Sequence, residues 1–209
     1  MVKNRIMEKS IIENGMNYLE YRALIHTLLE ENKTTGENQD EHYIQYTQLN
    51  EQRMNRNEKQ VVVIDDLKNT LSNLENKETW VVFSEAWCGD CAQILPVIAK
   101  IAETSNGKID LKIIIKSEHK DEMQHYLTNG TEAVPKLVRF ESETLNEIGS
   151  WGARPEKAQA IAEHWKKNKD TIPKEEFHKE LHLWYAKDKG VEIQKEFLML
   201  LKENVNVSL

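Results

Sequence analysis

Both cysteines of the chain lie in one short stretch, the sequence Cys-Gly-Asp-Cys at residues 88–91. A run of strand-forming residues, 80–83, comes before it, and an apolar run with helical spacing, 92–98, follows it. The pair is therefore predicted to lie where a strand passes into a helix. There the first sulfur meets unpaired N–H groups and the positive end of the helix dipole, which favour a thiolate over a thiol. This placement is typical of redox chemistry, and the rest of the predicted fold is arranged around it.

Other interpretations of the cysteine pair are weaker. A structural zinc site needs four ligands, and none of the seven histidines lies within a few residues of the pair, so no metal is expected. A disulfide that closes a loop of only Gly89 and Asp90 would add little chain-entropy stabilisation. Two inert thiols on a binding surface stay open as an alternative. The favoured interpretation is a dithiol that cycles with a disulfide, for which no cofactor is expected.

The stretch resembles the active site of the thioredoxin family, and two prolines extend the resemblance. Pro96 falls where thioredoxins carry a proline that kinks the active-site helix. Val134 and Pro135, followed by the apolar run 137–140, are similar to the cis-proline and the strand after it in that family. This resemblance covers about half of the chain, from about residue 60 to about residue 170.

A narrower similarity points to a bacterial branch of thioredoxin-like proteins that have helical extensions. We predict an N-terminal helical extension at residues 1–57, a thioredoxin-like domain at 58–170 and a C-terminal helical extension at 171–209. The first extension carries an apolar stripe that cannot stay in water, so we expect it to pack against the core. The narrower similarity rests on Trp-Cys-Gly-Asp-Cys, on Thr34-Thr35-Gly36 and on Trp151-Gly152-Ala153-Arg154-Pro155.

Hydrophobic periodicity predicts alternating strands and helices, that is, an α/β fold class. The resemblance to thioredoxins implies that these elements form a thioredoxin-like fold, with a central mixed sheet flanked by helices. The β-branched runs at 61–64 and 109–115 indicate buried strands. Residues 136–140 and 144–148 indicate a hairpin. The expected order is β-α-β-α-β-α-β-β-α, flanked by the extensions. Helices outside the active-site helix are expected at about 17–31, 40–55, after 65, 121–128, from 155, from 173 and after 190.

The resemblance to thioredoxins implies roles for individual residues. Cys88 would be the exposed nucleophile, and Cys91, one turn into the helix, would be the buried resolving thiol. The Cys88 thiolate would attack a disulfide to form a mixed disulfide, which Cys91 would then release. Pro135 would leave the peptide groups of Val134 free to pair with an extended substrate. Trp87 is expected beside the sulfurs, either as a lid or as a plain core aromatic.

Further recognition positions are expected around the active site. Trp151 and Gly152, with Arg154, are predicted in a loop that lies beside the cysteines and presents a surface for clients. The alternative is that Trp151 packs in the core and that Arg154 pairs with a carboxylate. The polar run of the second helix, which includes Arg53 and Arg56, either is a solvated face or lines a groove next to the thiols.

The sequence departs from the thioredoxin pattern at two places. Val82 stands where thioredoxins keep a buried aspartate, so the acid expected to help deprotonate Cys91 is missing. Glu85 is the nearest carboxylate and a candidate replacement, but strand alternation puts it on the opposite side from Val82. Asp90 stands where thioredoxins have proline. Its carboxylate either opposes thiolate formation at Cys88 or serves only as an acidic first-turn residue of the helix.

Composition limits the partners and the compartment. A formal net charge of -7 argues against nucleic-acid binding, which needs clustered lysine and arginine. No run of about 18 apolar residues suggests a membrane span, and no signal sequence is evident, so a cytoplasmic protein is expected. In a reducing cytosol a disulfide between two lone cysteines is transient and catalytic.

Two functions are carried forward. The first is a thiol-disulfide oxidoreductase of the thioredoxin type, whose partners are disulfide-containing client proteins and an electron-donating reductase. The second is a thioredoxin-like binding or adaptor module with slow or vestigial redox activity, which the missing acid and the extensions favour. The cysteine pair, Pro96 and Pro135 favour the first.

Overall fold

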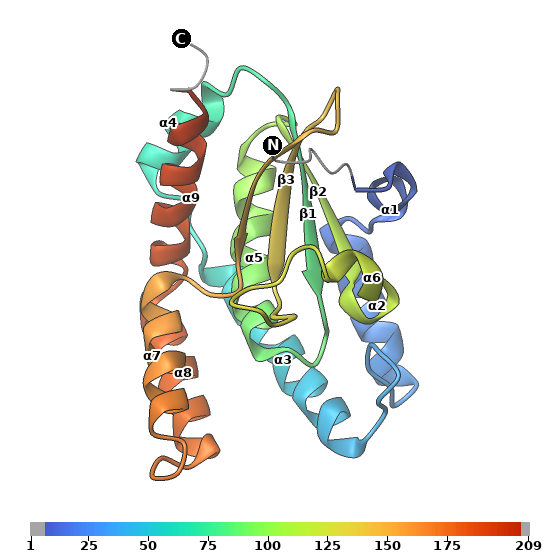
Figure 1. Ribbon diagram of the computed structural model, residues 1–209, viewed down its shortest axis with the longest axis vertical. Coiled ribbons are helices and arrows are strands. Elements are labelled where there is room, and N and C mark those ends of the chain that lie inside the picture. Colours follow the sequence, from blue (N-terminus) through green and yellow to red (C-terminus); the bar gives the residue numbers. More distant parts are fainter. Residues whose placement is uncertain (1–6, 206–209) are drawn as a thin grey trace.

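The computed structural model describes residues 7–205, and a sheet with helices on both sides forms its centre (Figure 1). The strands within these residues are β1 (Glu78–Ser84), β2 (Ile109–Ile115), β3 (Lys136–Glu141) and β4 (Glu147–Gly152). They form one four-stranded sheet in the order β2-β1-β3-β4. β1 runs parallel to β2, and β3 is antiparallel to β1 and to β4. The mixed sheet flanked by helices confirms the predicted α/β fold class.

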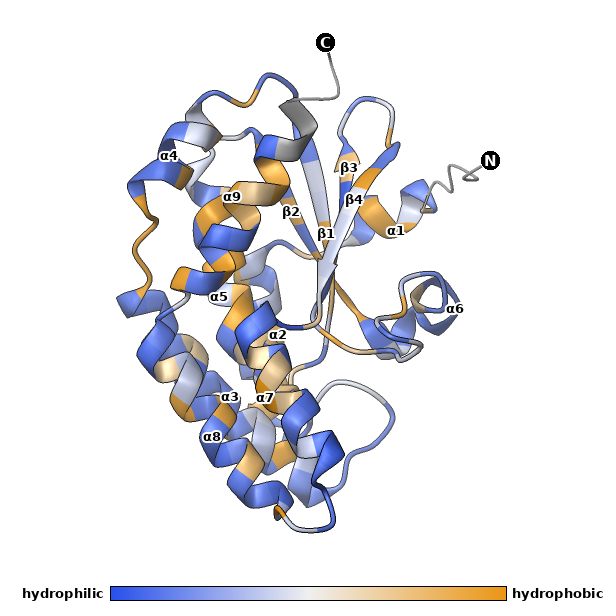
Figure 2. Cartoon of the chain, turned by 60° about the vertical axis from the view of Figure 1, so that its left-hand side comes forward, coloured by the Kyte–Doolittle hydropathy of each residue, from blue (hydrophilic) through white to orange (hydrophobic). Residues whose placement is uncertain are grey.

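The helix that follows the first cysteine, α5 (Gly89–Thr104), is a central element of the core. It is rich in buried apolar residues because it lies between the sheet and other helices (Figure 2). Pro96 within it has no backbone N–H, which leaves the carbonyl of Ala92 without its helical partner. Asn57 of α3 (Glu41–Gln60) donates its Nδ2 to that carbonyl over 3.3 Å. A side chain from the N-terminal part of the chain thus completes the hydrogen bonding of α5.

The N-terminal helices pack on this core as predicted. α1 (Lys9–Asn14) precedes α2 (Tyr18–Glu30), which begins with a capping box formed by Asn17 and Glu20. α2 packs on β2, and α3 packs along α5. The predicted helices at 17–31 and 40–55 are confirmed, although α3 continues to Gln60. Residues 1–6 of the predicted extension lie outside the described residues.

Three helices follow the sheet: α7 (Glu156–Lys167), α8 (Lys174–Asp188) and α9 (Val191–Val205). α7 and α8 pack against each other, whereas α9 packs on α5 and on α4 (Asp65–Ser72). In Figure 1, α7 and α8 lie at the lower left and α9 lies above them. The predicted C-terminal helices are therefore confirmed, and residues 206–209 lie outside the described range. The domain boundaries after residues 57 and 170 stay predictions.

The predicted strand at residues 61–64 is wrong, because no strand forms there. The segment is only partly buried, and Val62 is 72% exposed. Its backbone groups bond to a side chain instead of to a neighbouring strand. Gln194 of α9 accepts from the Ile64 N–H over 2.8 Å and donates to the Val62 carbonyl over 3.1 Å. A valine-rich run therefore lies outside the sheet because a glutamine from a distant helix satisfies its peptide groups.

Two other predicted elements have different bounds. The helix expected at 121–128 is shorter, with η1 (Lys116–Glu118) followed by α6 (Lys120–Met123). The chain then turns at Asn129 and Gly130, which both have positive φ. The second hairpin strand begins at Glu147 rather than 144, because Leu145 has a φ of 56° and belongs to the turn.

A buried ion pair fixes α9 to the sheet. Arg139 of β3 donates through Nη2 and Nε to the two carboxylate oxygens of Glu78 in β1, over 2.6 and 2.9 Å. Its Nη1 donates to the carbonyl of Leu200 over 3.1 Å, and the indole of Trp80 donates to Glu78 over 2.7 Å. The charges are thus compensated by a paired geometry and by further hydrogen bonds, as a buried pair requires.

Candidate functional site

Cys88 is the N-cap residue of α5, at the junction predicted from the sequence. Its Sγ accepts a hydrogen bond from the Cys91 N–H over 3.4 Å and donates to the carbonyl of Val134 over 3.4 Å. The bond between Val134 and Pro135 is cis. Cys88 is partly exposed, whereas Cys91 is buried, and both are free thiols. The structure therefore brings the four predicted residues together, with the helix N–H groups directed at the more exposed sulfur.

The surroundings of Cys91 contain polar groups that sequence analysis missed. Burial raises the pKa of the Cys91 thiol well above its ordinary value, and the hydrogen bond with Cys88 raises it further. The Ser84 side chain opposes this shift by hydrogen bonding to Cys91. Ser84 in turn shares a buried hydrogen bond with Tyr21 of α2, Oγ to Oη 2.9 Å. Strand alternation would have pointed to Ser84, because it lies on the same face of β1 as Val82.

Neither Val82 nor Glu85 supplies a free acid at this position. Val82 is fully buried and pairs with Leu137 in the sheet. Glu85 is also fully buried, and its two oxygens accept from Thr35 Oγ1 over 2.5 Å and from the Ser117 N–H over 2.8 Å. Glu85 therefore joins Thr35 of the N-terminal loop to Ser117 of η1, and each of its oxygens has a partner. The contact accounts for Thr35, one residue of the Thr-Thr-Gly sequence of that loop.

Asp90 is held by two residues from the C-terminal half of the chain. Arg154 Nη2 lies 2.6 Å from Asp90 Oδ2, and the hydroxyl of Tyr185 in α8 donates to Oδ1 over 2.8 Å. Burial, followed by the Asp90 charge, raises the pKa of Tyr185 well above its ordinary value, so this hydroxyl keeps its proton. The Asp90 carboxylate, which is expected to oppose the Cys88 thiolate, is thus paired with a positive charge. Arg154 forms the ion pair with a carboxylate that is one of its two predicted roles.

The first of the two residues between the cysteines, Gly89, lies under α8. The ring of His182 covers it, and His182 Nδ1 lies 3.2 Å from Gln93 Nε2 of α5. Because the amide nitrogen must donate, Nδ1 accepts and the imidazole proton is assigned to Nε2. Burial, followed by repulsion from Arg53, lowers the pKa of His182 to about 3. α8 therefore covers both residues between the cysteines, a relation that no local pattern predicts.

The aromatic and glycine positions predicted for substrate binding have different environments. Trp87 is partly exposed beside Cys88, and its ring packs edge-on against Tyr43 of α3, with centroids 5.2 Å apart. Trp151 lies in β4 instead of the predicted loop, is buried, and donates to Glu196 of α9 over 2.6 Å. Gly152 also lies in β4, where a Cβ would stand 2.4 Å from the Pro135 carbonyl oxygen. The expected loop placement of Trp151 and Gly152 is thus wrong, since β4 extends further than the sequence indicated.

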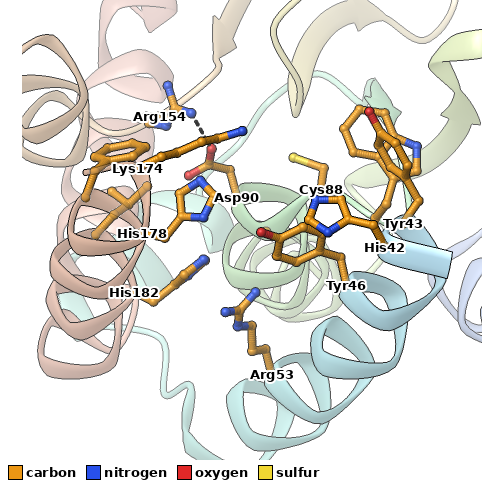
Figure 3. Close-up of a pocket in the computed structure, with 14 residues that line it drawn as sticks. His42, Tyr43, Tyr46, Arg53, Cys88, Asp90, Arg154, Lys174, His178 and His182 are labelled. Atoms are coloured by element: carbon orange, nitrogen blue, oxygen red, sulfur yellow. Dashed lines mark ion pairs between the residues drawn. The ribbon is translucent and has the colours of Figure 1, made fainter. Parts of the chain in front are cut away.

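A pocket of about 270 Å³ opens beside Cys88 between α3 and α8 (Figure 3). Figure 3 shows Cys88 at its centre, with Arg53 reaching in from α3 and the two histidines from α8. Among residues 7–205, no three His, Cys, Asp or Glu side chains are grouped to hold a metal ion. The lining consists of His42, Tyr43, Tyr46, Arg53, Trp87, Cys88, Gly89, Asp90, Arg154, Lys174, Phe177, His178, Leu181 and His182.

Comparisons with known proteins agree with this architecture. A family model described as thioredoxin matches residues 36–166. A solved structure of a protein of unknown function from Pseudomonas aeruginosa is similar in fold, with a TM-score of 0.58, 17% identity, and 96% of this chain and 99% of that chain covered. A structure described as an HIV epitope-scaffold gives a TM-score of 0.55 at 17% identity, covering 94% and 98%. Within the described residues, none of the helices has the length and apolar character to traverse a bilayer.

Proposed function

The chain belongs to the thioredoxin family, and from this we propose that it is a thiol-disulfide oxidoreductase that works through Cys88 and Cys91. The observation that carries the proposal is the hydrogen bond from the Cys91 N–H to Cys88 Sγ at the start of α5. A thiolate at that position is stabilised by the helix N-terminus. The nearby carbonyl of Val134 supports an extended substrate segment that pairs beside the sulfur.

The proposed reaction transfers two electrons from the protein dithiol to a substrate disulfide. The Cys88 thiolate attacks one substrate sulfur, which breaks the substrate S–S bond and releases one substrate thiolate. Cys91 then attacks Cys88 Sγ of the mixed disulfide, loses its proton to solvent, and releases the second substrate thiolate. The chain is left with a Cys88–Cys91 disulfide, and the substrate has gained two electrons. An electron-donating reductase must restore the dithiol, and disulfide-containing proteins are the proposed clients.

A binding or adaptor module is the second candidate. Two observations favour it: the buried Val82 supplies no acid at its position in β1, and α8 covers both residues between the cysteines. Burial keeps the pKa of Cys91 high, which slows its attack on a mixed disulfide. The two candidates differ in whether the disulfide forms reversibly at a cellular potential.

A redox titration of the full chain against glutathione tests the proposal. We expect a reversible two-electron transition of Cys88 and Cys91 near the cytosolic poise of roughly −220 to −320 mV. In cell lysate, Cys91→Ser should accumulate mixed disulfides, whereas Cys88→Ser should accumulate almost none. If no reversible disulfide forms, the adaptor function is favoured. Equal trapping by both variants would contradict the assigned roles of the two cysteines.

A further inference from the structure

Three cationic side chains from separate segments reach the pocket beside Cys88. Arg53 comes from α3, Lys174 from the first turn of α8, and Arg154 from the segment before α7 (Figure 3). Asp90 is the one carboxylate among the described residues that line the pocket, and it is bonded to Arg154. Two positive charges are therefore left without a lining carboxylate. This local excess is opposite in sign to the net charge of the chain, which is -7.

The contacts of the arginines indicate unused donors. Arg53 Nη1 donates to Asn50 Oδ1 over 2.7 Å, and across residues 7–205 no ion pair forms at Arg53 or at Lys174. Burial and the neighbouring Arg56 lower the pKa of Arg53, so its charge is held against an unfavourable environment. The Nε of Arg154 is buried and has no hydrogen-bond partner among the described residues. A half-buried arginine without a counter-ion is costly, and an anion in the pocket removes that cost.

The histidines of α8 add hydrogen-bond donors rather than charge. Burial lowers the pKa of both His178 and His182, so both rings are neutral near pH 7. The hydroxyl of Tyr46 on α3 faces the same pocket (Figure 3). Neutral donors around fixed cations suit an oxyanion, which accepts several hydrogen bonds at once.

We infer that this pocket binds an acidic group, a carboxylate or a phosphate, which the substrate carries close to its disulfide. The inference rests on the proposed function and specifies its substrate class. A volume of about 270 Å³ fits a small group rather than a folded segment. The acidic group comes either from a low-molecular-weight disulfide or from an acidic residue beside a cysteine in a client.

Three small disulfides of similar length test the inference with the reduced full-length protein. They are dithiodiglycolate with two carboxylates, the neutral bis(2-hydroxyethyl) disulfide, and cystamine with two ammonium groups. In each case the disulfide is reduced to two thiols while Cys88 and Cys91 are oxidised to a disulfide. The single-turnover rate of the protein with each disulfide is divided by the rate at which free mercaptoethanol reduces the same disulfide. This ratio corrects for the different intrinsic reactivities of the three disulfides. We expect the corrected rate for dithiodiglycolate to exceed that of the neutral compound by roughly tenfold, with cystamine the slowest.

Variants separate anion binding from a general effect on the Cys88 thiolate. Arg53→Gln and Lys174→Gln should each lower the ratio of the anionic to the neutral rate. Lys59→Gln removes the same charge from the exposed end of α3 and should keep the ratio. If Arg53→Gln and Lys174→Gln lower the reaction rates with all three disulfides by the same factor, the cations act on the Cys88 thiolate and the inference is overturned. Lys174 is exposed, so its variant keeps the test decisive if Arg53→Gln fails to fold.

A second arm distinguishes the source of the acidic group. Two disulfide-linked peptides are compared that carry either Asp or Asn next to the cysteine. If the Asp peptide reacts faster than the Asn peptide but dithiodiglycolate is not preferred, the acidic group belongs to a protein client. If dithiodiglycolate is preferred but the two peptides react equally, the acidic group belongs to a small molecule. No charge preference in either arm overturns the inference while the proposed function stands. No reaction with any disulfide overturns the proposed function and this inference with it.

Discussion

The imidazole of His182 lies so close to Gly89 that a Cβ atom at residue 89 would stand 2.8 Å from its Cε1. The same Cβ would stand 3.3 Å from Nη1 of Arg53. The glycine between the cysteines is therefore required by packing from α8 and α3. This explains one position of the motif through elements that lie far from it in sequence.

Gly89→Ala should destabilise the protein. In an open helical position the substitution gains up to about 1 kcal/mol, because glycine is the poorer helix former. Here overpacking against His182 costs about 1–3 kcal/mol, so we expect a net loss in the free energy of unfolding. Urea unfolding measures it. In the His182→Ala background the same substitution should become stabilising, and a loss of equal size in both backgrounds would contradict the contact.

The free energy of unfolding should fall in acid through His182. Its pKa is about 3 in the folded protein, against about 6.5 when unfolded. Between these values only the unfolded chain binds the proton, so stability decreases as pH falls from about 6.5, by up to about 1.4 kcal/mol per pH unit. Above about pH 6.5 the contribution is fully present.

Unfolding curves near pH 7 and near pH 5 measure this effect. His182→Asn should reduce the difference between the two conditions, whereas His164→Gln, at an exposed position of α7, should keep it. An unchanged difference in His182→Asn would show that other groups cause the loss.

Ser84→Ala should slow the release of the mixed disulfide. Burial and Cys88 raise the pKa of Cys91, and the Ser84 hydroxyl opposes that shift. Without this hydrogen bond the pKa of Cys91 rises further and its thiolate fraction falls, so we expect the release step to slow by roughly tenfold. Rapid mixing of a Cys88 mixed disulfide measures the release step. Ser72→Ala on the exposed face of α4 is the control, and equal rates in both variants would exclude Ser84 from the step.

Asn57→Ala should cost about 1–3 kcal/mol, because it leaves the buried carbonyl of Ala92 without a donor. Pro96→Ala restores a backbone N–H four residues after Ala92. The cost of Asn57→Ala should therefore be smaller when residue 96 is alanine. A double-mutant cycle by urea unfolding measures the coupling. Additive costs would mean that Asn57 acts only through its other contacts with α5.

Sequence reasoning succeeded where the signal is local. The junction at Cys88 and the helix that contains Pro96 follow from neighbouring residues, and both are found in the structure. The cis bond before Pro135, which only the resemblance to thioredoxins implies, is also found. Trp151 is predicted in a loop but lies in β4, because the end of this strand depends on its pairing with β3 rather than on its own pattern. The contact of Tyr185 with Asp90 joins residues 95 positions apart, and no local pattern in either segment predicts it. The unpredicted part of the site is thus made by helices whose packing partners are distant.

The two hydrogen bonds of Gln194 bear on how the chain is made. They join residues 130 and 132 positions apart, so the peptide groups of Val62 and Ile64 receive these partners only after Gln194 has left the ribosome. Until then its valines and the face of α4 beside them lack the cover of α9. A nascent chain of this protein therefore exposes this apolar surface until α9 emerges, and we expect chaperones to bind the chain during that interval.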